Sequence, residues 1–468
     1  MYRKKYHIHF VGVGGIGMSG IAELLLNLGY QVSGSDLKSS DITRRLASLG
    51  GTITTGHTPE HVAGADVVVV SSAVSWENPE VAAARDAGIP VIPRAEMLAE
   101  LMRLKYSIAV AGAHGKTTTT SLVAEVLNEA GLSPTVVIGG KLRGLGVNAV
   151  LGKGEFLVAE ADESDGSFLK MAPSIAVVTN IDREHVDHYP DLASVKNAFL
   201  LFLDRVPFYG VSVLCLDNPA VQDLIPQVSR RYLTYGLSPQ ADVRAKDVEV
   251  AGSGTDFTAV FQGQDLFRVR LGIPGRHNVV NSLAAVAVGL ELSIPPETIC
   301  AALTKVRGVG RRLEVMGETC GVLVLDDYGH HPTEIMATLA AVRDCWPGRR
   351  VLVVFQPHRY TRTSALMQDF SRAFYQADKL LVLPVYPAGE EPIPGADHES
   401  LCESIKNHGH KNVSAAWTME EAVEKLTANA RENDIVLTLG AGDVFKVGTA
   451  FLERKASGQN GTDGPAGA

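Results

Sequence analysis

The chain has 468 residues, a formal net charge of −9, 46% hydrophobic residues and 20% charged residues. This length exceeds what one hydrophobic core supports and predicts about three domains. The negative charge argues against nucleic acid as the main partner, because binding to a phosphate backbone needs a concentrated basic surface. No apolar run approaches the roughly 20 residues of a membrane-spanning helix, so we predict a soluble protein without a membrane span.

The N-terminus and the cysteines favour a cytoplasmic location. Residues 1–15 (MYRKKYHIHFVGVGG) pass from a few basic residues directly into a strand and a glycine loop, without the apolar core of a signal peptide. The five cysteines are scattered and include no C-x-x-C pair for zinc or a redox disulfide. We therefore expect reduced, packed cysteines in a cytoplasmic protein.

Apolar strands alternate with helical stretches in residues 1–104. The segments HIHFVGVG, QVSGSD and ADVVVVSSA read as strands, and MSGIAELLLNLG and PEVAAARDAG read as helices. This alternation predicts a parallel sheet with crossover helices, which is a Rossmann-like α/β domain.

A glycine loop follows the first of these strands. Gly12, Gly14 and Gly17 form G-x-G-x-x-G between a strand and a helix, and Asp36 closes the next strand. This arrangement is typical of pyrophosphate binding at a helix N-terminus, with the acid bonded to a ribose or base edge. The motif alone leaves open NAD, another diphosphate ligand and a tight structural turn.

Residues 105–312 begin a second α/β series with AGAHGKTTTT. Gly112 and Gly115 are separated by only two residues before Lys116 and Thr117, which is two residues shorter than the usual G-x-x-x-x-G-K-[ST] loop. The chemistry is retained, because glycines let backbone N–H groups converge, the lysine supplies a cation and the threonine can reach Mg²⁺. We predict a tight phosphate-binding loop in a P-loop ATPase-type domain. A plain strand-to-helix turn would leave the lysine and threonines unexplained.

The rest of this domain supplies acids, histidines and a decorating hairpin. The strand EFLVAEAD leads to Glu160, Asp162 and Glu163, in the position of magnesium-binding acids, and SIAVVTNID is followed by His185 and His188. Solvated surface carboxylates are the alternative. The period-two segment FTAVFQGQDLFRVRLGI predicts an antiparallel hairpin, and NVVNSLAAVAVGLEL predicts a helix.

A third strand series occupies residues 313–455, with strands GVLVLDDYG, RRVLVVFQPH, KLLVLPVY and DIVLTLGAG. It predicts a second Rossmann-like α/β domain. The motifs LDDYGHHPTE and FQPHRYTRT end two of these strands, where open α/β sheets place ligands, and Arg359 and Arg362 can fork onto a carboxylate. Residues 456–468 lack apolar periodicity and predict a disordered tail.

The combination of motifs resembles the Mur ligases of cell-wall synthesis, which use the shortened G-x-x-G-K-[ST] loop. The resemblance extends to about residue 452. It implies an enzyme of peptidoglycan precursor synthesis with ATP and Mg²⁺ (or Mn²⁺) as cofactors. It is strongest to the branch that joins L-alanine to the lactyl carboxylate of UDP-N-acetylmuramate through an acyl phosphate. A murein peptide ligase that joins a tripeptide to the same sugar nucleotide is the alternative.

The resemblance also implies residue roles. The ATP-binding residues would be Gly112, Ala113, His114, Gly115, Lys116, Thr117, Thr118, His277, Asn278 and Arg311. The UDP-sugar would be bound by Gly12, Gly14, Gly15, Gly17, Asp36, Ser71, Ser72 and Ala73. The amino acid would be bound by Tyr328, His330, His358, Arg359 and Arg362. The metal would be held by Thr117, Glu160 and His185. The catalytic residues would be Lys116, His185, Arg311, His330 and Arg359.

Two further expectations complete the interpretation. A monomer or weak homodimer is expected, and the carbamylated lysine of other family members is left open, with Lys170 as the nearby lysine. An NAD-dependent oxidoreductase is the competing enzyme class, but it leaves Lys116, Glu160, His185 and the arginine pair without a task.

Overall fold

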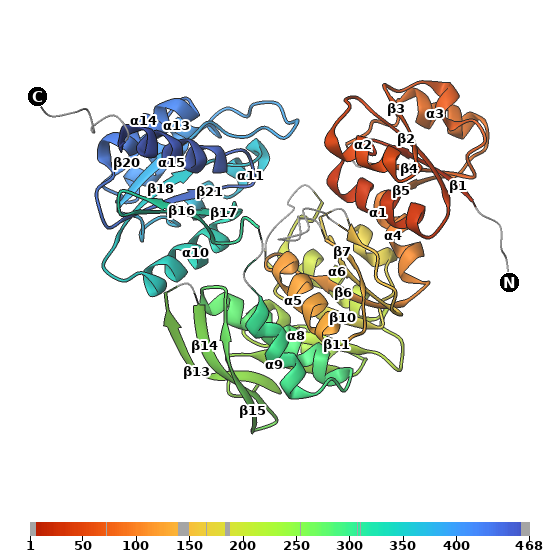
Figure 1. Cartoon of the computed structure of the whole chain (residues 1–468), viewed down its shortest axis with the longest axis horizontal. Coiled ribbons are helices and arrows are strands. Elements are labelled where there is room, and N and C mark those ends of the chain that lie inside the picture. Colours follow the sequence, from red (N-terminus) through yellow and green to blue (C-terminus); the bar gives the residue numbers. More distant parts are fainter. Residues whose placement is uncertain are drawn as a thin grey trace, which may run out of the picture. The chain divides into compact units, whose positions relative to one another are not determined.

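The structure is a computed structural model that describes residues 6–71, 73–138, 149–164, 166–182, 188–252, 254–306, 308 and 310–459. These residues form three sheets, of five, ten and six strands (Figure 1). The chain divides into two compact units, residues 1–246, 259–267 and 280–303 in one and residues 247–258, 268–279 and 304–468 in the other. We describe each by itself. Within the described residues, no helix is both long enough and apolar enough to cross a bilayer.

The first sheet is parallel and has the order β3-β2-β1-β4-β5. Its strands are β1 (His7–Val11), β2 (Gln31–Asp36), β3 (Thr52–Thr55), β4 (Val67–Val70) and β5 (Val91–Pro93). Its helices are α1 (Ile16–Asn27), α2 (Asp41–Ser48), η1 (Pro59–Val62), α3 (Pro79–Asp86) and α4 (Arg94–Met102). The strand order reverses between β1 and β4, so the glycine loop after β1 lies at the switch point where such sheets bind ligands.

A buried carboxylate joins several elements of this domain. Glu80, at the start of α3, is 0% exposed. It accepts hydrogen bonds from the ring of His61 at 2.6 Å and from the hydroxyl of Ser35 at 2.5 Å, and the ring of His9 lies 3.4 Å away. The ring of His57 lies 3.4 Å from the same carboxylate. A charge without water is tolerated only when it is paired and hydrogen-bonded, so these contacts fix the carboxylate in the interior.

The second sheet has the order β15-β14-β13-β12-β11-β10-β6-β9-β7-β8. Its strands are β6 (Tyr106–Ala111), β7 (Thr135–Val137), β8 (Ala149–Val150), β9 (Phe156–Glu160), β10 (Ile175–Val178), β11 (Val211–Cys215), β12 (Tyr232–Gly236), β13 (Val243–Ala251), β14 (Gly254–Phe261) and β15 (Gln264–Leu271). Its helices are α5 (Lys116–Glu129), η2 (Ser167–Lys170), α6 (Leu192–Leu203), α7 (Pro219–Gln222), η3 (Ile225–Gln227), α8 (Arg276–Glu291) and α9 (Pro296–Lys305). Strands β14 and β15 form the predicted hairpin. The hairpin does not merely decorate the domain, because β13 joins it to β12 and continues the sheet.

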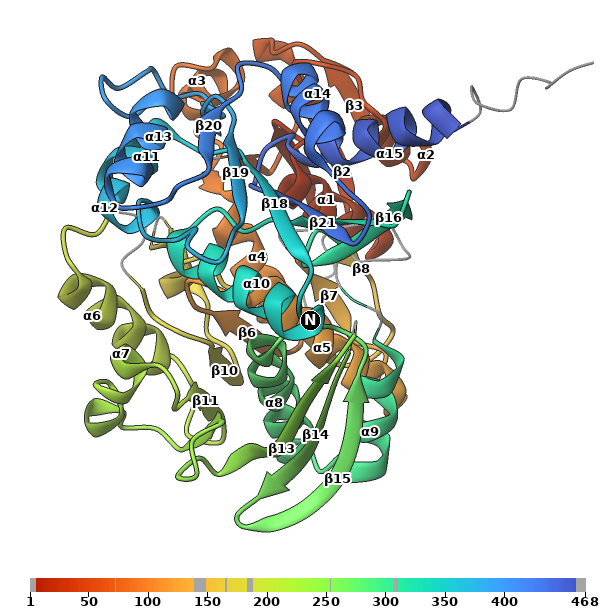
Figure 2. The same ribbon diagram turned by 90° about the vertical axis from the view of Figure 1, so that its left-hand side faces the viewer.

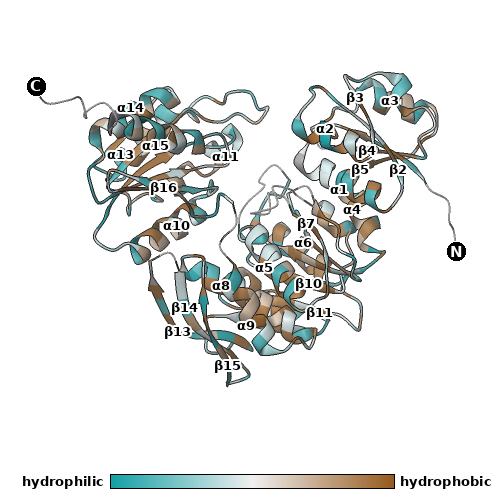
Figure 3. Cartoon of the chain, in the orientation of Figure 1, coloured by the Kyte–Doolittle hydropathy of each residue, from teal (hydrophilic) through white to brown (hydrophobic). Residues whose placement is uncertain are grey.

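The third sheet has the order β16-β17-β21-β18-β19-β20 and is parallel except for β16 (Figure 2). Its strands are β16 (Glu314–Thr319), β17 (Val322–Asp327), β18 (Arg350–Phe355), β19 (Lys379–Val382), β20 (Val413–Ala415) and β21 (Asp434–Leu439). Its helices are α10 (Pro332–Cys345), α11 (Tyr360–Ala365), α12 (Met367–Phe370), α13 (His398–Asn407), α14 (Met419–Asn429) and α15 (Phe445–Gln459). The strands of this sheet are coloured largely as hydrophobic in Figure 3. One cluster of buried residues packs the strands on α10, α12 and α13, and another packs them on α14 and α15, because parallel strands covered by helices are apolar on both faces.

Two sequence expectations need correction. Helix α15 runs to Gln459, so residues 456–459 belong to a helix and not to the expected tail. Phe451 anchors this helix in the core, and the following Leu-Glu-Arg-Lys-Ala run favours its continuation. Residues 460–468 lie outside the described part. The cysteines are free, but Cys320 is exposed and is therefore not a packing residue. Residue 104 lies between β5 of the first sheet and β6 of the second, and residue 312 lies between β15 of the second sheet and β16 of the third. The domain limits at these residues stay predictions.

Candidate active site

The short glycine turn connects β6 to α5 and is shaped by backbone conformations that suit glycine. Gly112 has φ +136° and Gly115 has φ +80°. A Cβ atom on Gly112 would lie 2.1 Å from the Thr179 hydroxyl oxygen, and one on Gly115 would lie 2.6 Å from the side-chain oxygen of Asn281. Only glycine fits both positions. The two missing residues of the standard loop therefore give a tighter turn that still ends at the N-terminus of a helix.

Two residues after β10 hold this turn. The His114 N–H donates to the side-chain oxygen of Asn180 at 2.8 Å, and the Asn180 amide donates back to the His114 carbonyl at 2.9 Å. The Thr179 hydroxyl donates to the same carbonyl at 2.6 Å. Because these contacts fix both the N–H and the carbonyl of His114, the protein's own side chains organise the turn, as a phosphate cradle requires.

Lys116 lies at the first position of α5 and faces a buried acid. Its ammonium nitrogen is 2.9 Å and 3.0 Å from the two carboxylate oxygens of Glu163, and it donates to the Gly112 carbonyl at 2.5 Å. Glu163 is 2% exposed. The sequence suggested three acids, Glu160, Asp162 and Glu163, as magnesium ligands. Of these, Glu163 is the ion-pair partner of Lys116.

Hard oxygen donors for a metal remain beside the turn. Thr117 is in the first turn of α5, and Glu160 ends β9 beside Val110 of β6, so both belong to the carboxyl edge of the sheet where the glycine turn begins. A hydroxyl and a carboxylate suit Mg²⁺. His185, the third predicted ligand, lies outside the described residues. Lys170 is half-exposed and pairs with Glu96 of α4.

We expect the substitution Gly112→Ala to weaken ATP use at least about tenfold, because the new methyl group would displace Thr179 and the peptide of Asn180 from the turn. The KM for ATP in a phosphate-release assay measures this effect. Gly131→Ala is a matched control: Gly131 also has positive φ, at +73°, but no described atom lies within 4 Å of its added Cβ. Equal effects of the two substitutions would contradict the steric explanation.

Ser35 and Asp36, at the end of β2, bond the first glycine loop. The N–H groups of Gly12 and Val13 donate to the Ser35 carbonyl at 2.9 Å and 3.0 Å, and the N–H of Gly14 donates to the Asp36 carboxylate at 2.8 Å. Asp36 was expected to bond a ribose or base edge, whereas its carboxylate here fixes the glycine loop itself. Gly17, at the start of α1, lies against the start of α4, since its added Cβ would be 3.0 Å from the Arg94 side chain.

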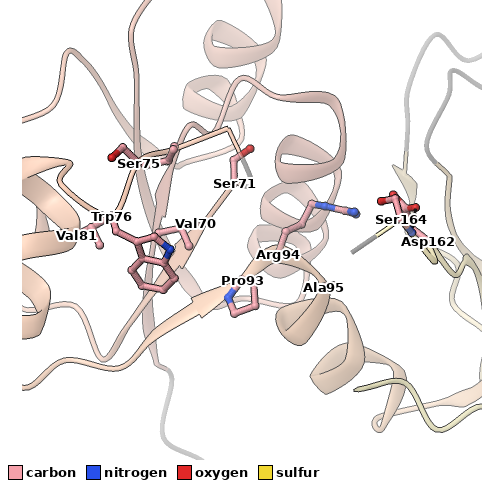
Figure 4. Close-up of a pocket in the computed structure, with 11 residues that line it drawn as sticks. Val70, Ser71, Ser75, Trp76, Val81, Pro93, Arg94, Ala95, Asp162 and Ser164 are labelled. Atoms are coloured by element: carbon pink, nitrogen blue, oxygen red, sulfur yellow. Dashed lines mark hydrogen bonds between the residues drawn. The ribbon is translucent and has the colours of Figure 1, made fainter. Parts of the chain in front are cut away.

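A pocket of about 230 Å³ opens beside this loop (Figure 4). Its lining residues come from β4 and the loop after it, from α3, from the end of β5 and the start of α4, and from the segment after β9: Val70, Ser71, Val74, Ser75, Trp76, Val81, Pro93, Arg94, Ala95, Asp162 and Ser164. Figure 4 shows the Arg94 side chain extending toward Asp162 and Ser164. Ser71 was predicted here, Ala73 lies in the exposed turn beyond it, and Ser72 lies outside the described residues.

The third sheet brings its predicted residues together at the ends of β17 and β18. The ring of His330 lies 5.4 Å from that of Tyr328 and 5.8 Å from that of His358, between ring centroids. The Arg362 guanidinium donates to the His358 carbonyl at 3.3 Å. Arg359 lies between them in sequence, and its guanidinium is 3.8 Å from Glu390. Five residues from two distant motifs therefore form one cluster of rings and cations.

Burial keeps the two histidines of this cluster neutral. It lowers the pKa of His330 to about 3, although the Glu334 carboxylate opposes the shift. It lowers the pKa of His358 to about 4, and the Arg362 charge lowers this pKa further. Near pH 7 each ring is therefore neutral and can accept a hydrogen bond at one nitrogen, while the arginines carry the positive charge.

Three other residues predicted to bind ATP belong to the second compact unit: Arg311, His277 and Asn278. Arg311 donates to the Asp326 carboxylate at 2.9 Å and to the carbonyls of Gly442 and Gly440 at 3.0 Å and 2.6 Å, so its guanidinium is bonded within the third domain. Burial lowers the pKa of His277 to about 4, and Arg312 lowers it further. The Asn278 amide donates to the Pro274 carbonyl at 2.7 Å. Their roles toward ATP stay predictions.

Sequence reasoning missed several residues. Asn281 contacts the glycine turn, Arg94 lines the pocket, and Tyr386 and Glu390 contact the third-domain cluster. Asn281 follows Asn278 by three residues, which places the two on one helix face and was a usable signal. Arg94 directly follows β5, so the strand-end rule could have found it.

Three family patterns match most of the chain. The Mur ligase family catalytic domain matches residues 7–106, the Mur ligase middle domain matches residues 110–289, and the Mur ligase glutamate ligase domain matches residues 311–442. The chain belongs to the Mur ligase family. Membership of this family accounts for a short glycine turn in a central α/β domain that is preceded and followed in sequence by another α/β domain. It also confirms the resemblance inferred from the motifs.

Three individual relatives are similar to the chain over nearly its whole length. The UDP-N-acetylmuramate–L-alanine ligase of Desulfatibacillum aliphaticivorans is 66% identical over 456 residues, covering 97% of this chain and 100% of the relative. The ligase of the same name from Desulfosudis oleivorans is 63% identical over 452 residues, covering 97% and 99%. The crystal structure of MurC, UDP-N-acetylmuramate-alanine ligase, from Thermotoga maritima matches with a TM-score of 0.80, 28% identity and coverage of 97% and 100%. This match confirms the three-domain α/β fold class.

A murein peptide ligase from Psychrobacter arcticus shares the fold, with a TM-score of 0.69 and 24% identity over 96% of this chain and 98% of that one. At this identity the likeness concerns the fold alone.

Proposed function

We propose that the chain is an ATP-dependent carboxylate–amine ligase that joins L-alanine to the lactyl carboxylate of UDP-N-acetylmuramate, giving UDP-N-acetylmuramoyl-L-alanine, ADP and phosphate. The observation that carries the proposal is the full-length identity of 66% to a UDP-N-acetylmuramate–L-alanine ligase, combined with the preformed turn ahead of Lys116. The reaction belongs to peptidoglycan precursor synthesis, and we assign it to the cytoplasm. Whether the enzyme is a monomer or a weak homodimer stays a prediction.

The reaction has two demands that the chain's residues can meet. A carboxylate resists attack by an amine because it is anionic and its oxygen leaves poorly. Transfer of the ATP γ-phosphoryl group to that oxygen gives an acyl phosphate, which the amine attacks, and phosphate then leaves as the amide forms. Lys116 and the N–H groups at the start of α5 supply positive charge to the transferring phosphoryl group.

The proposal assigns binding tasks to the remaining residues. Mg²⁺ held by Thr117 and Glu160, with His185 predicted as the third ligand, would neutralise charge on the ATP phosphates. The loop Gly12 to Gly17 and the pocket of Ser71 and Arg94 would hold the sugar nucleotide. Arg359 and Arg362 would bind the alanine carboxylate, and a neutral His330 or His358 can accept a hydrogen bond from the amine.

A murein peptide ligase is the nearest alternative, because it would use the same ATP chemistry with a larger amine. The identity of 24% to a solved structure of that activity is much lower than the identities of 66% and 63% to the alanine ligases. Identity over the whole length therefore favours the single amino acid.

A phosphate-release assay with UDP-N-acetylmuramate and each acceptor in turn tests the proposal. We expect release with ATP, Mg²⁺ and L-alanine and little release with the tripeptide, and the rates with serine and glycine measure how strictly alanine is selected. Mass spectrometry of the product should give the sugar nucleotide extended by one alanine residue. Preference for the tripeptide would replace the proposal by its alternative, and release without any amine would contradict both.

A further inference from the structure

Arg359 has a strained backbone. Its φ is +70° and its ψ is 135°, between the end of β18 and the start of α11. Residues other than glycine rarely occupy this region, so the conformation is strained. Such a conformation persists only where the surroundings fix it, so neighbouring residues must hold Arg359 in place.

The segment of residues 383–390 that follows β19 supplies the backbone part of this support. We call it the clamp. The Arg359 N–H donates to the Tyr386 carbonyl at 2.9 Å, and the Tyr386 N–H donates to the Pro357 carbonyl at 2.8 Å. His358 and Tyr386 thereby form a parallel bridge that extends the β18–β19 pairing beyond both strands. The strained peptide is thus bonded on its N–H side to the clamp.

Glu390 supplies the second support. Its two carboxylate oxygens accept the Thr361 N–H at 3.1 Å and the Thr361 hydroxyl at 2.8 Å, and one of them is 3.8 Å from a terminal nitrogen of Arg359. Burial opposes the charge of Glu390, but the bonds from Thr361 outweigh it and lower the pKa of the carboxyl. A charged Glu390 therefore ties the start of α11 to the clamp while it faces the arginine.

Tyr386 fixes the neighbouring histidine. Its ring is stacked on the His358 ring, with centroids 5.4 Å apart and planes at 7°. The Tyr386 ring also lies on Gly442, where an added Cβ would be 2.9 Å from a ring carbon. His358 therefore rests on a ring that is itself packed on backbone.

We propose that Tyr386 and Glu390 are positioning residues, which hold His358 and Arg359 in the geometry that receives the carboxylate of the amino acid. This inference rests on the proposed function. Among the described residues, Glu390 is the ion-pair partner of the Arg359 guanidinium. The other N–H groups of this guanidinium can therefore fork onto a carboxylate. Neither residue touches the substrate in this assignment.

Discrimination between L-alanine and L-alaninamide tests the inference, because the amide lacks the carboxylate charge. The variants are Glu390→Gln, which keeps an acceptor for Thr361 but loses the charge, and Tyr386→Leu, which loses the stacked ring. The matched controls are Glu391→Gln, an exposed neighbour, and Tyr386→Phe, which keeps the ring. We expect the ratio of kcat/KM for L-alanine over L-alaninamide to fall about tenfold in the two variants, as for one weakened charge-assisted contact. The KM for ATP and both controls should stay near wild type.

Four outcomes distinguish the positioning role from a purely structural role and from failure of the proposed function. A lower ratio with unchanged KM for ATP supports the positioning role. An equal loss with both acceptors, accompanied by a lower Tm, would mean that the clamp is only structural. Wild-type ratios in both variants would overturn the inference but leave the proposed function intact, whereas a wild-type protein that does not use alanine at all would overturn the proposed function first.

Discussion

The substitution Lys116→Ala is expected to lower the rate of phosphate release at least about a hundredfold, because it removes a fixed positive charge from the place where charge moves during phosphoryl transfer. Lys116 is held at the first position of α5 by the Gly112 carbonyl and by Glu163. The glycine turn is also bonded to Thr179 and Asn180, so the turn itself should survive the loss of the lysine's bond to the Gly112 carbonyl. Single-turnover phosphate release at saturating ATP measures the effect on chemistry.

A buried acid complicates this substitution, and a second variant separates the two effects. Lys116→Ala leaves Glu163 buried without its ammonium partner, which is itself destabilising. The double variant Lys116→Ala, Glu163→Gln removes that charge and should regain stability but not activity. Lys196→Ala, which breaks a partly exposed pair with Asp223, serves as the control and should keep wild-type activity. Full phosphate release by the double variant would contradict the role of the lysine.

The substitution Glu80→Gln is expected to cost about 3 kcal/mol of stability in the first domain near pH 7. Burial raises the pKa of Glu80, but hydrogen bonds from His9, Ser35 and His61 outweigh burial and lower the pKa from 4.5 to about 2. A shift of this size corresponds to about 3 kcal/mol, at 1.36 kcal/mol for each pKa unit. Hydrogen exchange of the backbone amides of β1 and β2, measured at increasing urea concentrations, gives the free energy of unfolding of this domain.

The pH dependence of this difference has a definite sign. A carboxylate whose folded pKa is depressed stabilises the fold fully above its unfolded pKa, and this stability is lost as the pH falls from about 4.5 through about 2. The gap between wild type and Glu80→Gln should therefore shrink between pH 5 and pH 2. The exposed Glu60, on the neighbouring η1, provides the control Glu60→Gln, for which we expect no measurable change. A gap that stays constant over this pH range would contradict the assignment to Glu80.

Local patterns predicted much of the fold and of the site. Strand–helix alternation predicted the parallel sheets, and the position of Lys116 directly after Gly115 predicted a phosphate turn, because these features depend on neighbours in sequence. The motifs around Tyr328 and His358 were recognisable because parallel strands bring their carboxyl ends to one edge. The expected hairpin existed, but its continuity with the central sheet depended on β13, which carries no local signal for its partner.

The sequence by itself determined which segments become strands and helices, where the glycines force a turn, and which family the chain resembles, because periodicity and short motifs are encoded over a few residues. Only the tertiary structure decided that Glu163 pairs with Lys116, that Asp36 bonds the glycine loop, and that residues 383–390 hold the strained Arg359. Each of these depends on side chains that are distant in sequence and meet only after the sheets have formed, so no local pattern specifies which partner a charge will find.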